Sequence, residues 1–220
     1  MAAARRFHHF PVAHFCPVAH ALEALGERWA LLIVRDLLRG PQRFSDLERY
    51  LAGITPKRLT AHLRALEAAG LVARDRAAGR REVWYRLTPA GRELGPVVEA
   101  LAAWGFAHAL QPPAPGEAVH PEQLMAGLGA YLRRRGPRLA GPATWVVQFA
   151  DGPAYTVRYD GERWATEAGD APQPDVRVVT TPEDLAAFLA AGPEERPAER
   201  LQLSGAPDQV AELLSALPPR

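Results

Sequence analysis

The 220-residue sequence has one cysteine, one lysine and no apolar run of the ~20 residues that a membrane-spanning helix needs. The single cysteine, Cys16, excludes an intramolecular disulfide framework and a four-cysteine zinc site. Residues 1–20 carry Arg5 and Arg6 with no long apolar core behind them, so they lack the pattern of a signal peptide. We therefore expect a cytoplasmic protein that does not bind membranes.

The formal net charge of +1 is the sum of two halves of opposite charge. Residues 1–110 hold 16 Lys and Arg against 10 Asp and Glu, whereas residues 111–220 hold 10 against 15. This asymmetry indicates two domains with different partners, the basic one facing a polyanion. All basic residues except Lys57 are arginines, so arginine abundance alone supports a polyanion only weakly.

The segment from Gln111 to His120 has the composition of a linker. Its three prolines and one glycine disfavour both helix and strand. We therefore predict a basic domain over residues 1–110, a linker over 111–120 and an acidic domain over 121–220.

The basic domain has helical periodicity followed by a strand pattern. Thr55 and Pro56 are suited to begin a helix as N-cap and first helical residue, and Ser45 and Glu48 form a capping-box pattern. The expected order is helices at 19–38 (broken at Gly26), 45–51 and 55–69, strands at 71–73 and 83–87 around a turn at 77–80, and a helical region over 88–110. Two helices and a β-hairpin in this order predict a winged helix-turn-helix.

The helix at 55–69 separates apolar from basic residues by angle. At 100° per residue, Leu59, Leu63 and Leu66 fall within about 60° of one another and form a core face. Small and basic residues fall on the opposite face and its flanks, where they suit a DNA groove, and the hairpin arginines can reach phosphates. A merely solvated basic face is the alternative. The candidate DNA-binding residues are Ser45, Thr55, Lys57, Arg58, Thr60, Ala61, Arg64, Arg76, Arg80 and Arg81.

Many short motifs are spread over residues 14–106. They are Cys16-Pro17, Gly26-Glu27-Arg28-Trp29, Leu38-Arg39-Gly40, Arg43-Phe44-Ser45-Asp46-Leu47, Ile54-Thr55-Pro56-Lys57-Arg58-Leu59-Thr60, Leu63-Arg64-Ala65-Leu66-Glu67, Gly70-Leu71-Val72, Val83-Trp84-Tyr85, Leu87-Thr88 and Trp104-Gly105. Together these motifs resemble the HxlR-type transcriptional regulators. The resemblance implies a homodimeric bacterial repressor or activator that binds double-stranded DNA at a pseudo-palindromic operator. It also implies that 55–69 is the recognition helix and 74–86 the wing, although Trp84 stands where family members often have glutamate.

Apolar residues at helical spacing follow the hairpin. Leu94, Val97, Leu101 and Trp104 form a stripe that suits a dimer contact. The alternative is that this stripe packs on its own domain.

Cys16 lies at the start of the first expected helix, a position that favours the reactive thiolate. Some HxlR-type regulators use a cysteine at the matching position to sense oxidants or electrophiles, and the alternative is a buried, inert cysteine. His8, His9, His14 and His20 lie nearby, but their spacing matches no familiar ligand set, and we expect no metal site.

The acidic domain is predicted to be an α+β domain with a mainly antiparallel sheet. Its expected elements are helices at 121–135, 182–189 and 207–217 and strands at 145–149, 155–159, 164–166, 176–179 and 201–203. It lacks a nucleophile elbow, a phosphate loop and Cys/His ligand spacing, so we expect neither an enzyme nor a cofactor.

Three local features in this domain follow one another in order: Asp175-Val176-Arg177-Val178-Val179, Thr181-Pro182-Glu183-Asp184-Leu185 and Leu201-Gln202-Leu203-Ser204-Gly205. They resemble the sterol-carrier-protein-2-like domain, which implies a sheet with helices on one face and a tunnel for an apolar small molecule or fatty acid. A plain hydrophobic core is the alternative. The candidate pocket residues are Met125, Leu128, Trp145, Phe149, Tyr155, Trp164, Phe188 and Leu189.

The sequence thus predicts a dimeric regulator whose operator binding responds to an apolar effector. The alternative is a thiol-based sensor acting through Cys16, with a structural C-terminal domain. A further rival is an enzyme that uses the winged helix as a scaffold for dimerisation.

Overall fold

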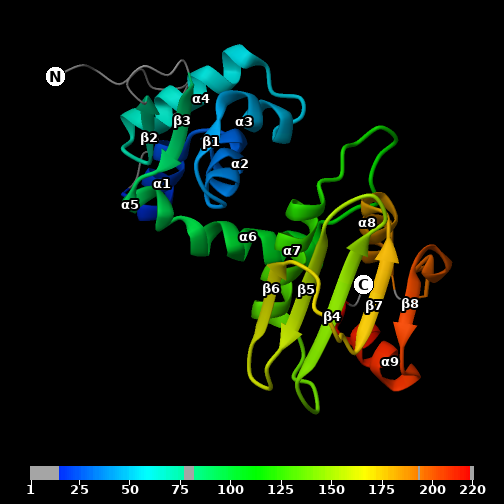
Figure 1. The fold of residues 1–220 in the computed structure, drawn as a ribbon. Helices are drawn as coiled ribbons and strands as arrows, with labels where there is room; N and C mark the ends of the chain where they lie inside the picture. Colours follow the sequence, from blue (N-terminus) through cyan, green and yellow to red (C-terminus); the bar gives the residue numbers. More distant parts are fainter. Residues whose placement is uncertain (1–14, 77–81, 193, 219–220) are drawn as a thin grey trace. The chain divides into compact units, whose positions relative to one another are not determined.

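The computed structural model describes residues 15–76, 82–192 and 194–218. Its contacts divide the chain between Val98 and Glu99 into two compact units, which are described separately (Figure 1). This division lies upstream of the linker that we predicted at 111–120. Phe106, on the helix before that linker, is buried in the core of the C-terminal unit, so the end of the helix packs with residues that follow it.

The N-terminal unit contains helices that begin and end close to the expected positions. Gly26, with a φ of 77°, separates the first two helices, as the sequence predicts. The helices are α1 (Pro17–Leu25), α2 (Arg28–Leu37), α3 (Phe44–Tyr50), α4 (Pro56–Ala68) and α5 (Pro89–Arg92), and α6 (Gly95–His108) crosses the division.

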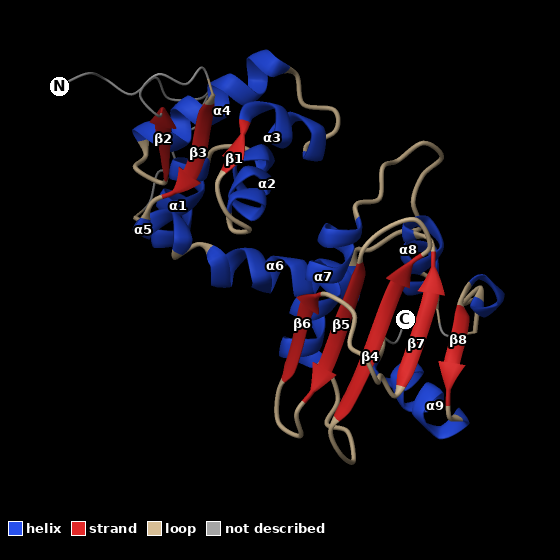
Figure 2. Cartoon of the chain, in the orientation of Figure 1, coloured by secondary structure: helices blue, strands red, loops and turns tan. Residues whose placement is uncertain are grey.

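The hairpin strands β2 (Val72–Arg76) and β3 (Val83–Leu87) pair antiparallel and form the wing (Figure 2). A two-residue strand, β1 (Gln42–Arg43), pairs with the other side of β3 and was not predicted. Within the described residues the sheet order is β1-β3-β2. The wing is therefore joined to the segment that leads directly into α3.

The C-terminal unit holds a five-stranded sheet, in the order β6-β5-β4-β7-β8 among the described residues. Strands β4 and β7 pair parallel and the other neighbouring strands pair antiparallel. The strands are β4 (Ala143–Phe149), β5 (Ala154–Tyr159), β6 (Trp164–Ala168), β7 (Val176–Thr180) and β8 (Gln202–Gly205).

Helices of this unit pack on one face of the sheet. Alternate residues of β4, such as Trp145 and Val147, enter a common core with Leu128 and Phe188 from the helices, and Figure 1 shows α7 and α8 behind the sheet. The helices are α7 (Pro121–Arg135), α8 (Pro182–Ala190) and α9 (Pro207–Ala216), with a short 3₁₀ turn, η1 (Ala198–Arg200), before β8. Among the described residues, no helix is long and apolar enough to cross a membrane.

Candidate nucleic-acid interface

Helix α4 is oriented by the burial of its leucine face. Leu59, Leu63 and Leu66 are at most 1% exposed and belong to the core of the N-terminal unit. Because an α-helix turns by 100° per residue, this burial directs the opposite side of α4 to solvent. Lys57 and Arg64 are accordingly exposed, together with Ala61.

The start of α4 is fixed by local chemistry. The Thr55 side-chain oxygen accepts a hydrogen bond from the backbone N–H of Arg58 at 3.4 Å, which confirms Thr55 as the N-cap. Pro56 occupies the first turn, where its missing N–H costs nothing. These two residues place Lys57 at the exposed N-terminal end of the helix.

The basic residues of α4 differ in what else they contact. Arg58 pairs with Glu27 at 3.4 Å, so its guanidinium is shared between the helix and the N-terminus of α2. Thr60 donates to the carbonyl of Pro56 at 2.8 Å. Lys57 and Arg64 have no ion-pair partner within the described ranges, which leaves both charges available to a polyanion.

Helix α3 begins one residue earlier than predicted, and Ser45 is not its N-cap. Arg43 is the N-cap, and its backbone N–H donates to the Asp46 carboxylate at 3.2 Å. Because β1 runs directly into α3, the cap falls on the last strand residue, and Ser45 lies exposed in the first turn. The hydrogen bond from the Arg43 side chain lowers the pKa of Asp46.

The structure describes only part of the wing arginines that the sequence singled out. Arg80 and Arg81 lie outside the described residues, and Arg76 is described only as the end of β2. Arg86 pairs with Asp75 across the hairpin, whereas Arg74 is exposed.

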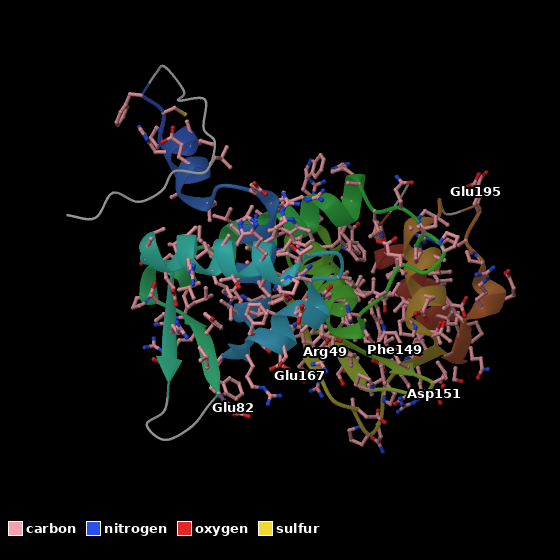
Figure 3. The ribbon with its side chains drawn as sticks, turned by 90° about the horizontal axis from the view of Figure 1, so that it is seen from above. Arg49, Glu82, Phe149, Asp151, Glu167 and Glu195 are labelled. Atoms are coloured by element: carbon pink, nitrogen blue, oxygen red, sulfur yellow. The ribbon has the colours of Figure 1, made fainter. Side chains whose placement is uncertain are left out.

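Trp84 lies 37% exposed on the wing, with the guanidinium of Arg43 5.5 Å from its ring centroid. Arg43 also bonds Glu82 at 3.4 Å, and Glu82, labelled in Figure 3, directly precedes β3. Among the described residues, Arg43, Glu82 and Trp84 thus form a mixed patch of charged and aromatic side chains.

His62 is a buried residue of α4 that sequence reasoning did not single out. It is 3% exposed, and its Nε2 lies 3.6 Å from the Glu27 carboxylate. Burial lowers the pKa of His62, with a further lowering by Arg58 and an opposing effect of Glu27. Its position one residue before Leu63, on the flank of the core face, is the only signal that could have found it.

Cys16 is the N-cap residue of α1 and is partly exposed, so it is not a buried cysteine. His8, His9 and His14 lie outside the described residues, and His20 lies 3.6 Å from Glu23. Within the described part of the chain, no three His, Cys, Asp or Glu residues are arranged to hold a metal ion.

The C-terminal unit encloses an apolar cavity of about 30 Å³ between its sheet and helices. Four predicted pocket residues line it: Leu128, Trp145, Phe188 and Leu189. Four others, Met125, Phe149, Tyr155 and Trp164, pack in the surrounding core without lining the cavity. The lining residues outside the predicted pocket set are Leu132, Val147, Val157, Val178, Leu185, Leu201, Leu213 and Leu217.

Taken alone, the helices, the wing and the exposed face of α4 define a winged helix-turn-helix protein. A model of the HxlR-like helix-turn-helix family matches residues 24–112. Two curated relatives are uncharacterised helix-turn-helix transcriptional regulators. YkvN of Bacillus subtilis is 41% identical over 105 residues, covering 46% of this chain and 89% of the relative. YtfH of Escherichia coli is 39% identical over 93 residues, covering 42% of this chain and 74% of the relative.

Among solved structures, the redox regulator HypR in its reduced form is 35% identical, with a TM-score of 0.39, and the match covers 41% of this chain and 90% of that chain. The chain belongs to the HxlR-like helix-turn-helix family and is a bacterial transcriptional regulator of that type.

The buried His62 predicts a pH-dependent stability. Because its pKa in the folded state lies below the ordinary value of 6.5, the unfolded chain binds the proton more tightly. The stability that neutral, buried His62 contributes is fully present above the ordinary pKa of 6.5, and it is lost as pH falls through the lower pKa of the folded state. Urea unfolding should therefore show wild type losing more stability than His62→Gln between about pH 7 and about pH 5. An equal loss in both proteins would contradict the prediction.

Proposed function

We propose that the protein binds operator DNA as a homodimer, with α4 in the major groove and the wing beside it. The observation that carries this proposal is the exposed face of α4. Lys57 and Arg64 flank Ala61 there without ion-pair partners among the described residues, and the opposite face is buried. Arginine in a major groove can bind guanine, and both cations can neutralise phosphate.

Exposed apolar residues on α1 and α6 support a dimer. On α6, Val97, Leu101 and Trp104 are each at least half exposed and follow helical spacing, whereas Leu94 packs on its own core. On α1, Val18 and Leu22 are 66% and 55% exposed. Exposed apolar patches of this kind mark interaction sites, and a dimer lets two recognition helices bind two half-sites.

For the C-terminal unit, we propose a sterol-carrier-like domain that binds an apolar effector and carries no catalytic activity. Its helices cover one face of the sheet, and an entirely apolar set of side chains surrounds the cavity between them. A volume of about 30 Å³ is far below the several hundred Å³ of a ligand site, so a ligand requires the cavity to widen. Binding therefore favours a different arrangement of this unit, which is the requirement for linkage to DNA affinity.

Substituting Arg64 tests the DNA interface. A duplex selected by the protein from a random-sequence pool serves as operator, and affinity is measured at fixed salt. Arg64→Ala should weaken binding by about 1–3 kcal/mol and relax sequence preference at one position per half-site. Arg163→Ala, which removes an exposed arginine of the C-terminal unit, is the matched control and should bind as wild type does. An unchanged affinity of Arg64→Ala for the duplex would contradict the proposal that α4 is the recognition helix.

A second test addresses the dimer. Leu22→Asp and Leu101→Asp each place a charge on an exposed apolar face and should shift the protein toward monomer in sedimentation velocity. Ala24→Asp adds the same charge at an exposed α1 position away from Val18 and Leu22 and should leave the dimer intact. A wild-type protein that sediments as a monomer would exclude the proposal.

The alternative is redox control through Cys16, which is partly exposed at the N-terminus of α1 where a thiolate is favoured. Effector control and redox control can be distinguished by measuring affinity for the operator in the presence of 1-decanol and, separately, of hydrogen peroxide. An apolar effector should change affinity by about 1–3 kcal/mol in both wild type and Cys16→Ser. Release by peroxide alone, absent in Cys16→Ser, would favour the thiol sensor.

A further inference from the structure

Glu27 lies between α2 and α4, and its carboxylate is shared by two side chains of α4. It is the N-cap of α2 and follows Gly26, whose φ of 77° turns the chain between the first two helices. Its side chain makes no capping hydrogen bond to α2. Its Oε2 lies 3.4 Å from Nη2 of Arg58 and 3.6 Å from Nε2 of His62. One carboxylate oxygen therefore faces two side chains that can carry a positive charge.

Arg58 and His62 lie on the same side of α4 because they are four residues apart. At 100° per residue, this side falls between the buried leucine face and the exposed face that carries Lys57 and Arg64. His62 is accordingly 3% exposed, whereas the Arg58 side chain is 58% exposed. Arg58 thus lies at the edge of the face proposed to contact DNA, a position that suits the phosphate backbone better than the base edges in the groove.

The Glu27 carboxylate and a DNA phosphate would compete for the Arg58 guanidinium, since both accept charge-assisted hydrogen bonds. An exposed ion pair of this kind shifts an equilibrium by about two- to five-fold. The pair therefore restrains the guanidinium without immobilising it. Among the described residues, Lys57 and Arg64 have no comparable ion pair, so Arg58 differs from both in being held beside another helix.

We propose that Glu27 is a positioning residue that holds Arg58 beside α2 and thereby limits the sequence-independent part of DNA affinity. A phosphate gains Arg58 as a contact only when the pair with Glu27 opens. Because His62 faces the same carboxylate oxygen, a proton on His62 attracts that oxygen and weakens the pair. The inference rests on the proposed binding of DNA through α4, and it assigns Arg58 to the DNA backbone and not to a base.

The test measures the affinity of the full chain for two duplexes of equal length and composition, the selected operator and a scrambled sequence. Glu27→Gln removes the charge and keeps the shape of the side chain. It should bind both duplexes about two- to five-fold more tightly than wild type does at about 0.1 M salt. The slope of log affinity against log salt should steepen by about 0.9, which corresponds to one additional phosphate contact.

Two further variants determine whether Glu27 acts through Arg58. In an Arg58→Gln background, adding Glu27→Gln should leave the affinity unchanged, because the cation that Glu27 restrains is absent. Glu93→Gln is the matched control, since Glu93 is an exposed acid of the same unit at the end of α5, and it should bind as wild type does. Near-UV circular dichroism establishes that each variant is folded.

The charged groups around His62 come from three elements. Glu27 at the start of α2 and Arg58 on its own helix both act on its titration. On β2, which also packs on α4, Arg74 is exposed and Asp75 pairs with Arg86 across the hairpin. Among the described side chains, Glu27 is therefore the carboxylate that a proton on His62 would attract.

The pH profile is a readout that a purely structural role of Glu27 would not change. Burial lowers the pKa of His62 below its ordinary value of 6.5, so His62 gains its proton toward the acid end of a range from about pH 7.5 to about pH 5.5. Wild type should bind the scrambled duplex more tightly as pH falls through this range. The gain should be smaller in Glu27→Gln, which has no shared carboxylate, while the other histidines are the same in both proteins.

The possible outcomes separate this inference from the function on which it rests. If Glu27→Gln leaves the affinity unchanged or lowers it, if its gain persists in the Arg58→Gln background, or if its pH profile equals that of wild type, the inference is wrong while DNA binding through α4 stands. If wild type binds neither duplex, the proposed DNA binding is itself wrong, and the inference falls with it.

Discussion

The burial of one leucine face determines what α4 can do. Leu59, Leu63 and Leu66 recur at helical spacing and are nearly inaccessible, so the helix cannot rotate without exposing them. Rotating even one leucine from core to solvent costs about 1.5–3 kcal/mol, a large part of the stability of a small domain. The orientation of Lys57 and Arg64 is therefore a consequence of packing on the other side of the helix. The proposed recognition of DNA by α4 therefore depends first on this hydrophobic packing and only then on the charges of Lys57 and Arg64.

Elements with strong local signals were predictable. Thr55 and Pro56 mark the start of α4, and Thr181 caps α8 by accepting from the backbone of Asp184, because these signals lie within one turn of chain. Strand β1 was missed because two residues carry no periodicity and their pairing with β3 is a tertiary contact. The capping of α3 was misassigned for the same reason. The N-cap of α3 is Arg43 and not Ser45 because β1 ends at Arg43 and the helix begins at the next residue.

The site residues divide in a similar way. Alternation along β4 predicts that Trp145 and Phe149 face the core, and both do, but only Trp145 lines the cavity. Periodicity tells which residues point inward, whereas a cavity lies where the packing of several elements is incomplete. That depends on side chains far apart in sequence, such as Leu132 and Leu217. His62 was missed because its importance comes from burial, which a single residue in a sequence does not report.

Lys57 is the only side-chain amine in the sequence, and it stands exposed near the start of α4. Amine-reactive reagents can therefore modify only one side chain in this sequence, and that side chain lies on the face of α4 proposed to contact DNA. A fluorophore or crosslinker attached there would report directly on the approach of a duplex. Acylation of this one nitrogen would remove a cation from that surface and leave every arginine unmodified.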